Sequence, residues 1–344
     1  MKNTIILMTA LLPTTGHADL INFAKNFADT QVHVLVNSRT FEPLEGYLRV
    51  EALKEYSIKS FDNVQIKYST NDDAPQNPSD MKVGFWEWWR NEINKNFPNV
   101  EKWDYVVASE SYGKSVAESL EADFIPYDIS RFHNKTKSTS VREDIWNNWD
   151  NILPLIQRKL LFKAVMFGQE SVGKTTLSCE VSSILNIPWI VEYARPYLEE
   201  VGAELSMKKM NHIHLGQNSL QNLFSYKASH PALVFDTDLF STIGYYRIMN
   251  EPVPEQLVKD ALNFEADVYY LLPDNIPLVK DPLRYGGNKR ESSLKFWIDL
   301  LEEFNQEYIL VPPGSVDKKS HWISKDIKMR FEAKTFSLRN FART

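Results

Sequence analysis

Residues 168–175 read G-Q-E-S-V-G-K-T, a complete G-x-x-x-x-G-K-[ST] phosphate-binding loop between a hydrophobic run and a helix-forming segment. The glycines let the backbone curl so that successive N–H groups point at a polyphosphate, and the helix start adds partial positive charge. Lys174 then reaches the β- and γ-phosphates, and the Thr175 hydroxyl is a ligand for Mg²⁺. ATP is expected to contact the loop residues Gly168, Ser171, Gly173, Lys174, Thr175 and Thr176.

Acidic residues follow the next strand-like runs of the same half. Glu192 lies at the end of one run, and Asp236 directly follows the apolar run 232–235, where phosphate-loop enzymes place a Mg²⁺ ligand. Phosphoryl transfer needs a carboxylate near the acceptor hydroxyl, so we predict catalytic roles for both, with Asp236 also a metal ligand. Which of them is the general base stays open, and for each acid a helix cap or a surface salt bridge is the alternative.

Other polar residues of this half are candidate ligand contacts. The loop 281–290 carries glycines and arginines and is expected to close over the transferring phosphoryl group. The expected phosphate contacts there are Arg284 and Arg290. The expected substrate contacts are Tyr193, Arg195, Asp238 and Asp281, with Gln217 a further candidate.

A second chemical site is predicted near the start of the chain. Thr14, Gly16 and His17 lie on a strand-to-helix turn, where glycine permits close approach and helix N–H groups face an anion. His17 can donate a hydrogen bond to a phosphate oxygen that gains charge in a transition state. A histidine at a helix start is otherwise an ordinary polar cap.

The segment 137–144, K-S-T-S-V-R-E-D, opens another predicted helix. Ser140 and Glu143 fit a capping box, which is a purely structural explanation for those two residues. It leaves Arg142 unexplained, because the helix dipole disfavours a cation at that end. An anion bound by Arg142 together with the Ser138 and Thr139 hydroxyls would explain the arrangement.

Strand-like and helix-like segments alternate along the whole chain, which predicts α/β architecture with two parallel sheets. The expected strands are 3–10, 32–38, 64–69, 105–109 and 123–127 in the first series, and 161–167, 189–194, 232–238, 267–273 and 308–313 in the second. The expected helices of the first half lie near 43–58, 84–96, 112–121 and 141–150. Pro154 interrupts the chain near the seam, so we expect domains at 1–154 and 155–344.

The two motifs T/H-x-G-H and S-T-x-x-R resemble those of the nucleotidyltransferase superfamily of adenylyltransferases. Followed by a phosphate-loop half, they make the chain similar to the NadR-type enzymes over about residues 4–311. Further matching pieces are S-E-S-Y-G at 109–113, V-E-Y-A-R at 191–195, D-T-D at 236–238 and D-P-L-R at 281–284.

The resemblance implies a Rossmann-like nucleotidyltransferase domain followed by a P-loop kinase domain. The second would phosphorylate nicotinamide riboside to nicotinamide mononucleotide (NMN), and the first would transfer an adenylyl group from ATP to NMN, giving NAD and pyrophosphate. Mg²⁺ would assist, and Thr14, His17 and Arg142 would hold the triphosphate. Tyr112 is an expected substrate contact, and Trp86 or Trp88 is expected to stack on the positively charged ring, although burial in a helix face is the alternative for the tryptophans.

Composition bounds the remaining possibilities. The 344 residues carry a net charge of −6, which does not favour nucleic acid, and no run approaches the length of a membrane span. The apolar N-terminal run fits a buried strand better than a signal peptide, so a cytoplasmic protein acting on small molecules is expected. The single cysteine, Cys179, is expected to be a buried packing residue, and a homo-oligomer is left open.

The last thirty residues hold eight Lys and Arg against three Asp and Glu. We interpret them as a terminal helix whose apolar residues pack on the kinase-like half, namely Trp322, Ile323, Ile327, Phe331 and Phe336.

Two rival functions are considered: a kinase–adenylyltransferase fusion acting on another vitamin nucleoside, and a regulator that senses ATP and NAD without turnover. The phosphate loop disfavours a riboflavin kinase fusion, and the retained His17 and Arg142 disfavour a sensor.

Overall fold

The computed structural model describes the chain except for residues 28, 58–62, 82–83, 135, 274–291 and 342–344. It divides into two compact units, Met1–Lys159 with Thr335–Thr344, and Leu160–Lys334. The division therefore falls at Leu160 rather than residue 155, and the last ten residues belong to the first unit. None of the helices in the described part of the chain is long and apolar enough to cross a membrane.

The first unit is built on a five-stranded parallel sheet with strand order β3-β2-β1-β4-β5. Its strands are β1 (Lys2–Met8), β2 (Thr30–Ser38), β3 (Val64–Thr70), β4 (Tyr105–Ala108) and β5 (Asp123–Pro126). Its helices are α1 (Thr15–Lys25), α2 (Gly46–Ser57), α3 (Phe85–Asn96), α4 (Tyr112–Leu120), α5 (Ser138–Glu143) and α14 (Phe336–Asn340), with the short 3₁₀ turns η1 (Pro78–Asp80) and η2 (Trp149–Asn151). The helix α6 (Pro154–Leu160) leads to the second unit. Strand order reverses between β1 and β4, so the loops after these two strands diverge at the carboxyl edge of the sheet.

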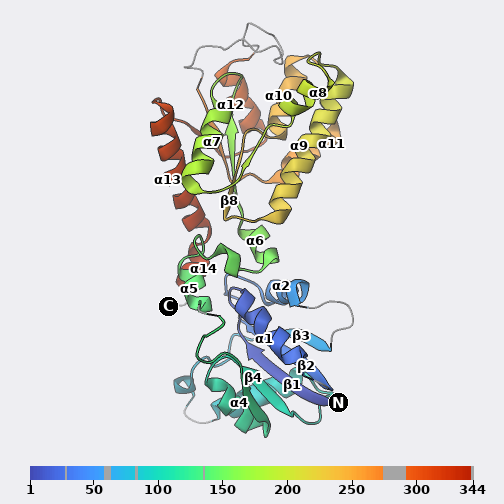
Figure 1. Ribbon diagram of the computed structural model, residues 1–344, viewed down its shortest axis with the longest axis vertical. Helices are drawn as coiled ribbons and strands as arrows, with labels where there is room; N and C mark the ends of the chain where they lie inside the picture. Colours follow the sequence, from blue (N-terminus) through green and yellow to red (C-terminus); the bar gives the residue numbers. More distant parts are fainter. Residues whose placement is uncertain (28, 58–62, 82–83, 135, 274–291, 342–344) are drawn as a thin grey trace. The chain divides into compact units, whose positions relative to one another are not determined.

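The second unit has its own five-stranded parallel sheet, in the order β10-β9-β6-β8-β7. Its strands are β6 (Phe162–Phe167), β7 (Trp189–Ile190), β8 (Ala232–Phe235), β9 (Val268–Leu271) and β10 (Tyr308–Leu310). Its helices are α7 (Lys174–Leu185), α8 (Ala194–Val201), α9 (Met207–Lys227), α10 (Leu239–Ile248), α11 (Glu255–Phe264), α12 (Leu294–Glu303) and α13 (Val316–Lys334). Figure 1 shows α7 and α13 together on one face of this sheet and α9 and α11 on the other.

The inner strands β1, β2, β4, β6, β8 and β9 are mostly buried on both faces, which explains their nearly continuous apolar runs, whereas the edge strands β3, β5 and β10 are partly exposed. Val165, Phe167, Phe235 and Leu271 are fully buried in the core of the second unit. The ten expected strands are all present and the two parallel sheets are confirmed, with strand ends shifted by a few residues. The N-terminal run forms β1, which lies between β2 and β4 in the sheet.

Three local predictions were wrong. The expected helix at 141–150 is a short α5 followed by turns, because the Asp144 side chain bonds Asn147 locally, its carboxylate accepting from the backbone N–H at 3.2 Å. Cys179 is exposed, since α7 buries a different face that includes Leu177 and Val181. Phe336 is exposed on α14 in the first unit, whereas α13 buries Ile323, Ile327 and Phe331 in the second.

Candidate functional site

The loop between β6 and α7 has the backbone geometry that a phosphate cradle needs. Gly168, Ser171 and Gly173 all have positive φ, at 130°, 58° and 89°. At Gly168 an added Cβ would also lie 3.0 Å from the Leu272 carbonyl oxygen, so glycine is required there for both conformation and space. The left-handed turns point consecutive N–H groups inward and deliver the chain to the start of α7.

Lys174 is folded back over this loop. Its ammonium donates hydrogen bonds to the carbonyl oxygens of Gly168 at 2.9 Å and of Gln169 at 2.8 Å. The ammonium is thereby held at the loop, where it can bind the oxygens of a phosphate. The neighbouring Thr175 and Thr176 are exposed at the first turn of α7.

Asp236 lies at the end of β8 beside Thr175. It is only 2% exposed, and its Oδ1 has no hydrogen-bond partner among the described residues. The pKa of this carboxyl is raised to about 7, mainly by burial and also by the charge of Glu192, against the opposing effects of a hydrogen bond with Thr175 and the charges of Lys174 and Arg195. An unpartnered buried carboxylate oxygen beside a threonine hydroxyl suits a Mg²⁺ ion, which takes one or two carboxylates together with nucleotide phosphates.

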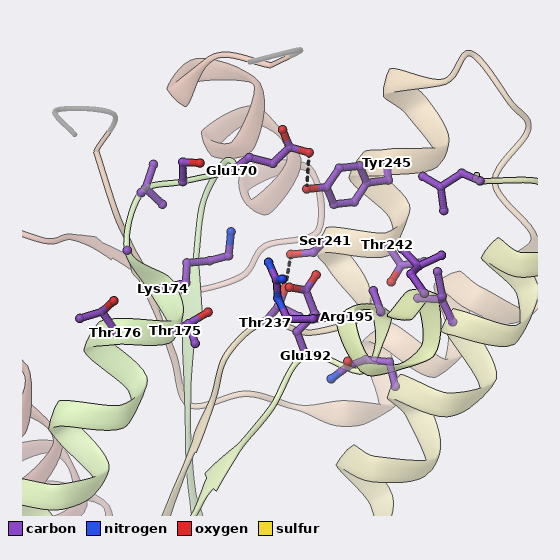
Figure 2. Close-up of a pocket in the computed structure, with 18 of the residues that line it drawn as sticks. Glu170, Lys174, Thr175, Thr176, Glu192, Arg195, Thr237, Ser241, Thr242 and Tyr245 are labelled. Atoms are coloured by element: carbon purple, nitrogen blue, oxygen red, sulfur yellow. Dashed lines mark hydrogen bonds between the residues drawn. The ribbon is translucent and has the colours of Figure 1, made fainter. Parts of the chain in front are cut away.

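A cavity of about 510 Å³ opens beside the phosphate loop within the second unit. Its polar end is lined by the loop and by Glu192 and Arg195 from the segment after β7, and Figure 2 shows these two side chains beside Thr237 on the side of the cavity that Lys174 faces. The aliphatic residues that line it outside the loop are Ala194, Leu198, Leu205, Met210, Ile213 and Val316. The cavity thus joins a phosphate-binding loop to a space that accepts a largely apolar molecule.

Two contacts between residues that line this cavity were not predicted from the sequence. Thr237 has a φ of 141°, an unfavourable value for a β-branched residue, and its hydroxyl donates to the Ser241 Oγ at 2.5 Å. On the loop side, the Tyr245 hydroxyl donates to Glu170 Oε1 at 3.1 Å (Figure 2). No sequence signal identified these pairs, because each depends on α10 lying opposite the loop.

Several expected contacts of this half lie elsewhere. Asp238 caps α10, accepting from the backbone N–H of Phe240 at 3.0 Å and from the Tyr269 hydroxyl at 2.5 Å, and it does not line the cavity. Burial raises its pKa to about 7. The Tyr193 ring packs against α9 outside the cavity. Asp281, Arg284 and Arg290 fall outside the described residues.

In the first unit, Thr14 and His17 lie where β1 leads into α1. The Thr14 backbone N–H donates to His17 Nδ1 at 3.1 Å, and the Thr14 hydroxyl lies 2.8 Å from the same nitrogen. Nδ1 is therefore an acceptor, so the neutral ring carries its proton on Nε2. The pKa of His17 is lowered to about 4, first by burial and then by the charges of Arg131 and Arg142. His17 is thus a neutral hydrogen-bond donor with two cations nearby.

Arg142 has an unsatisfied donor. Its Nη1 is buried and has no partner among the described residues, and burial lowers the pKa of the guanidinium. The helix α5 begins at Ser138, so Ser140 is not a cap and Arg142 lies in its last turn, contrary to the capping argument made from the sequence. The orphaned N–H still favours an anion, because a buried charged donor is costly when left unpaired.

The remaining expected residues of this unit differ in exposure. The Ser138 hydroxyl donates to the Leu12 carbonyl at 3.4 Å, and Thr139 is exposed. Gly16 has ordinary space around it, since an added Cβ would come no closer than 3.8 Å to Asn134 or Thr14. The fold itself therefore does not require glycine at this position.

Arg131 is a residue that sequence reasoning missed. It follows β5 in a left-handed conformation with φ 56°, its guanidinium pairs with Glu110 at 3.0 Å, and its charge acts on His17. Asp128 shapes this loop by accepting backbone N–H groups from Phe132 and Asn134, each at 2.7 Å. Only the irregular loop brings Arg131 to the site, so no periodic pattern marks it.

Tyr112 and the tryptophans of α3 contribute mainly to packing. The Tyr112 hydroxyl donates to the Leu7 carbonyl at 2.7 Å, and burial raises its pKa. Trp86 and Trp88 are half-buried against the core cluster of this unit, while Trp89 is buried in it. Trp86 contacts Phe85 edge-to-face with the ring centroids 4.7 Å apart.

Comparison with known proteins gives matches to both units. A protein-family model described as an AAA domain matches residues 163–319. Among curated proteins, the trifunctional NAD biosynthesis/regulator protein NadR of Escherichia coli (strain K12) is 23% identical over 244 residues, 68% of this chain and 59% of the relative. The protein of the same name from Salmonella typhimurium (strain LT2) is 24% identical over 243 residues, 67% and 58% respectively. The chain thus spans less than two thirds of the length of these relatives.

Two solved structures have a similar fold over nearly the whole chain. A crystal structure of a NadR protein in complex with NAD and AMP-PNP has a TM-score of 0.66 and 19% identity, covering 97% of each chain. A NadR protein in complex with NR has a TM-score of 0.63 and 19% identity, covering 96% of each chain. At this identity the likeness establishes the two-sheet α/β fold and its order along the chain.

Proposed function

We propose that the second unit is a kinase that transfers the γ-phosphoryl group of ATP to the hydroxymethyl group of nicotinamide riboside. One observation carries the proposal: Lys174 of the phosphate loop and the carboxylate of Glu192 line the same cavity, so donor and acceptor groups can meet there. The similarity to a NadR structure that holds NR supports the choice of acceptor. The product of this step would be NMN.

Each residue of this cavity has a distinct part in that reaction. The loop N–H groups and Lys174 hold the β- and γ-phosphates, which spreads the charge that develops on the transferred group. Glu192, which lines this cavity, would accept the proton of the acceptor hydroxyl, and Arg195 would neutralise charge at the same end. Thr175 and Asp236 would hold Mg²⁺, which screens the phosphate oxygens when bound.

The first unit, in this proposal, is a Rossmann-like nucleotidyltransferase that joins NMN to the adenylyl group of ATP. The phosphate of NMN attacks the α-phosphorus of ATP and pyrophosphate leaves, so no protein nucleophile is required. His17 would donate through Nε2–H to the charged phosphate oxygens, and the orphaned Arg142 N–H would pair with the same anion. The likeness to a NadR protein that holds NAD and AMP-PNP supports this assignment.

Incubation of the purified chain with ATP, Mg²⁺ and nicotinamide riboside tests the proposal. Chromatography should show NMN and then NAD, and supplying NMN directly should give NAD and pyrophosphate. If nicotinamide riboside is not consumed although a second vitamin nucleoside is phosphorylated, the acceptor is misidentified. If neither nucleoside is phosphorylated while ATP still binds, the sensor alternative replaces the enzyme.

A further inference from the structure

Gln217 of α9 is a buried amide with half of its hydrogen-bonding capacity unused. It is 2% exposed and lines the cavity beside the phosphate loop. Its Oε1 accepts the backbone N–H of Tyr193 at 2.9 Å, whereas its Nε2 has no partner among the described residues. The buried NH₂ group is therefore a hydrogen-bond donor for which the described residues provide no acceptor.

The orientation of this amide is fixed by its surroundings. A Cβ on Gly216 would lie 2.0 Å from the Tyr193 ring, so the ring lies directly on the helix backbone beside Gln217. This packing sets the position of the Tyr193 N–H, which can only donate and so requires the amide oxygen on its side. The NH₂ end must then lie on the other side and cannot be exchanged with the oxygen.

The residues around Gln217 indicate which kind of molecule carries the hydrogen-bond acceptor for its NH₂ group. The residues that α9 gives to the cavity are Met210, Ile213 and Gln217, which share one helix face at spacings of three and four. Leu198 and Leu205 line the same cavity, while Glu192 and Arg195 provide its charged end. An apolar wall suits a flat ring, and a donor within it suits a carbonyl oxygen on that ring.

We propose that Gln217 binds the ring substituent of the phosphoryl acceptor, its Nε2 donating to the carbonyl oxygen of the nicotinamide carboxamide. This inference rests on the proposed kinase function and names the contact that recognises the base. Removing a buried neutral donor from such a contact leaves the substrate carbonyl unpaired, which weakens binding about tenfold. The loss is expected on the KM for the acceptor, because the contact is made with the base and not with the hydroxyl that reacts.

The test measures steady-state kinetics of the full chain with nicotinamide riboside and, separately, with nicotinic acid riboside. Gln217→Glu keeps an oxygen for the Tyr193 N–H and replaces the NH₂ donor with a carboxyl oxygen. We expect the KM for nicotinamide riboside to rise about tenfold and the KM for the acid to rise at least tenfold more, because two carboxylates then face each other. The KM for ATP should not change.

Gln221 provides a matched control, since it lies one turn further along α9, is 1% exposed and does not line the cavity. Gln221→Glu should leave both acceptor KM values unchanged. If Gln217→Glu does not fold, Gln217→Met removes the NH₂ donor, and with it the oxygen that accepts the Tyr193 N–H, without adding charge, and should raise the KM for nicotinamide riboside at least tenfold.

The outcomes separate this inference from the proposed function. Equal losses for both ribosides in Gln217→Glu, or an unchanged KM in the Met variant, would overturn the role of Gln217 alone. A wild-type chain that phosphorylates neither riboside would overturn the proposed kinase function, and the inference with it.

Discussion

Replacing Asp236 with asparagine should stabilise the second unit at alkaline pH and abolish the kinase activity proposed for it. The wild-type carboxyl is 2% exposed, with one oxygen lacking a partner among the described residues. Burial therefore destabilises the ionised form of this carboxyl, and a bound cation would offset that cost. Asparagine has nearly the same shape, carries no charge, and keeps an oxygen for the Thr175 hydroxyl.

The size of the effect follows from the pKa. Burial raises the pKa of Asp236 from 3.8 to about 7. The native state therefore keeps a proton that the unfolded chain releases between these two values, so the free energy of unfolding falls as pH rises through this window. At ~1.4 kcal/mol per pH unit the full penalty at pH 8 is ~4 kcal/mol, and we expect ~2–4 kcal/mol to be recovered in Asp236→Asn. At pH 5, about 1.2 pH units above the unfolded pKa, the penalty is only ~1.6 kcal/mol, so the two proteins should differ less than half as much as at pH 8.

Thermal melting of both proteins at pH 5 and pH 8, without nucleotide, measures this difference. A gain of ~2 kcal/mol corresponds to roughly 4–8 °C in the melting temperature of a unit of this size. Asp238 is present in both proteins, so its own raised pKa cancels in the comparison. Adding Mg²⁺ and ATP at pH 8 should raise the melting temperature of the wild type more than that of the variant. A variant that melts below the wild type at pH 8, or that gains as much from Mg²⁺ and ATP, would refute this account of Asp236.

Three further predictions concern the separation of the two sites and the first unit. Lys174→Ala should abolish NMN formation but spare conversion of NMN to NAD, and His17→Ala should do the reverse; loss of both steps in a folded variant would contradict two independent sites. Because the pKa of His17 is lowered to about 4, the ring stays neutral at higher pH, and the NMN-to-NAD rate should show no histidine titration between pH 5 and 8. An inflection near pH 6.5 that disappears in His17→Asn would contradict this assignment. The Gly16→Ala variant should melt within about 2 °C of the wild type, because the added Cβ meets only ordinary contacts. The same variant should transfer the adenylyl group at least tenfold more slowly, because the Cβ obstructs the nucleotide. An unchanged rate would show that no ligand approaches this position.

The sheets and the phosphate loop could be predicted because their signals are local. Apolar runs mark strands that are buried on both faces, and the glycines at 168 and 173 mark backbone conformations that other residues rarely adopt. Short elements were less predictable, since α5 depends on competition between helix hydrogen bonds and the Asp144 side chain. The exposure of Cys179 depends on which face of α7 the sheet covers, which its neighbours in sequence do not decide.

The candidate sites were predictable to different degrees. Lys174, Thr175, Glu192 and Asp236 come together because parallel strands end at one edge of a sheet. Asp238 follows the same strand as Asp236 but caps α10. The sequence does not distinguish which of these two neighbouring aspartates is the metal ligand and which is the helix cap. Arg131 reaches His17 through an irregular loop, so only the three-dimensional structure reveals it.

The return of α14 to the first unit has a consequence for chain architecture. The second unit is an insertion between Lys159 and Thr335, and its two ends meet, because the Lys334 ammonium donates to the Leu161 carbonyl at 2.7 Å. A single cut at residue 160 would therefore remove from the first unit the helix α14, which packs on α5, the helix that carries Arg142. Excising 160–334 and bridging the gap with a short linker should therefore leave the chain of each unit whole.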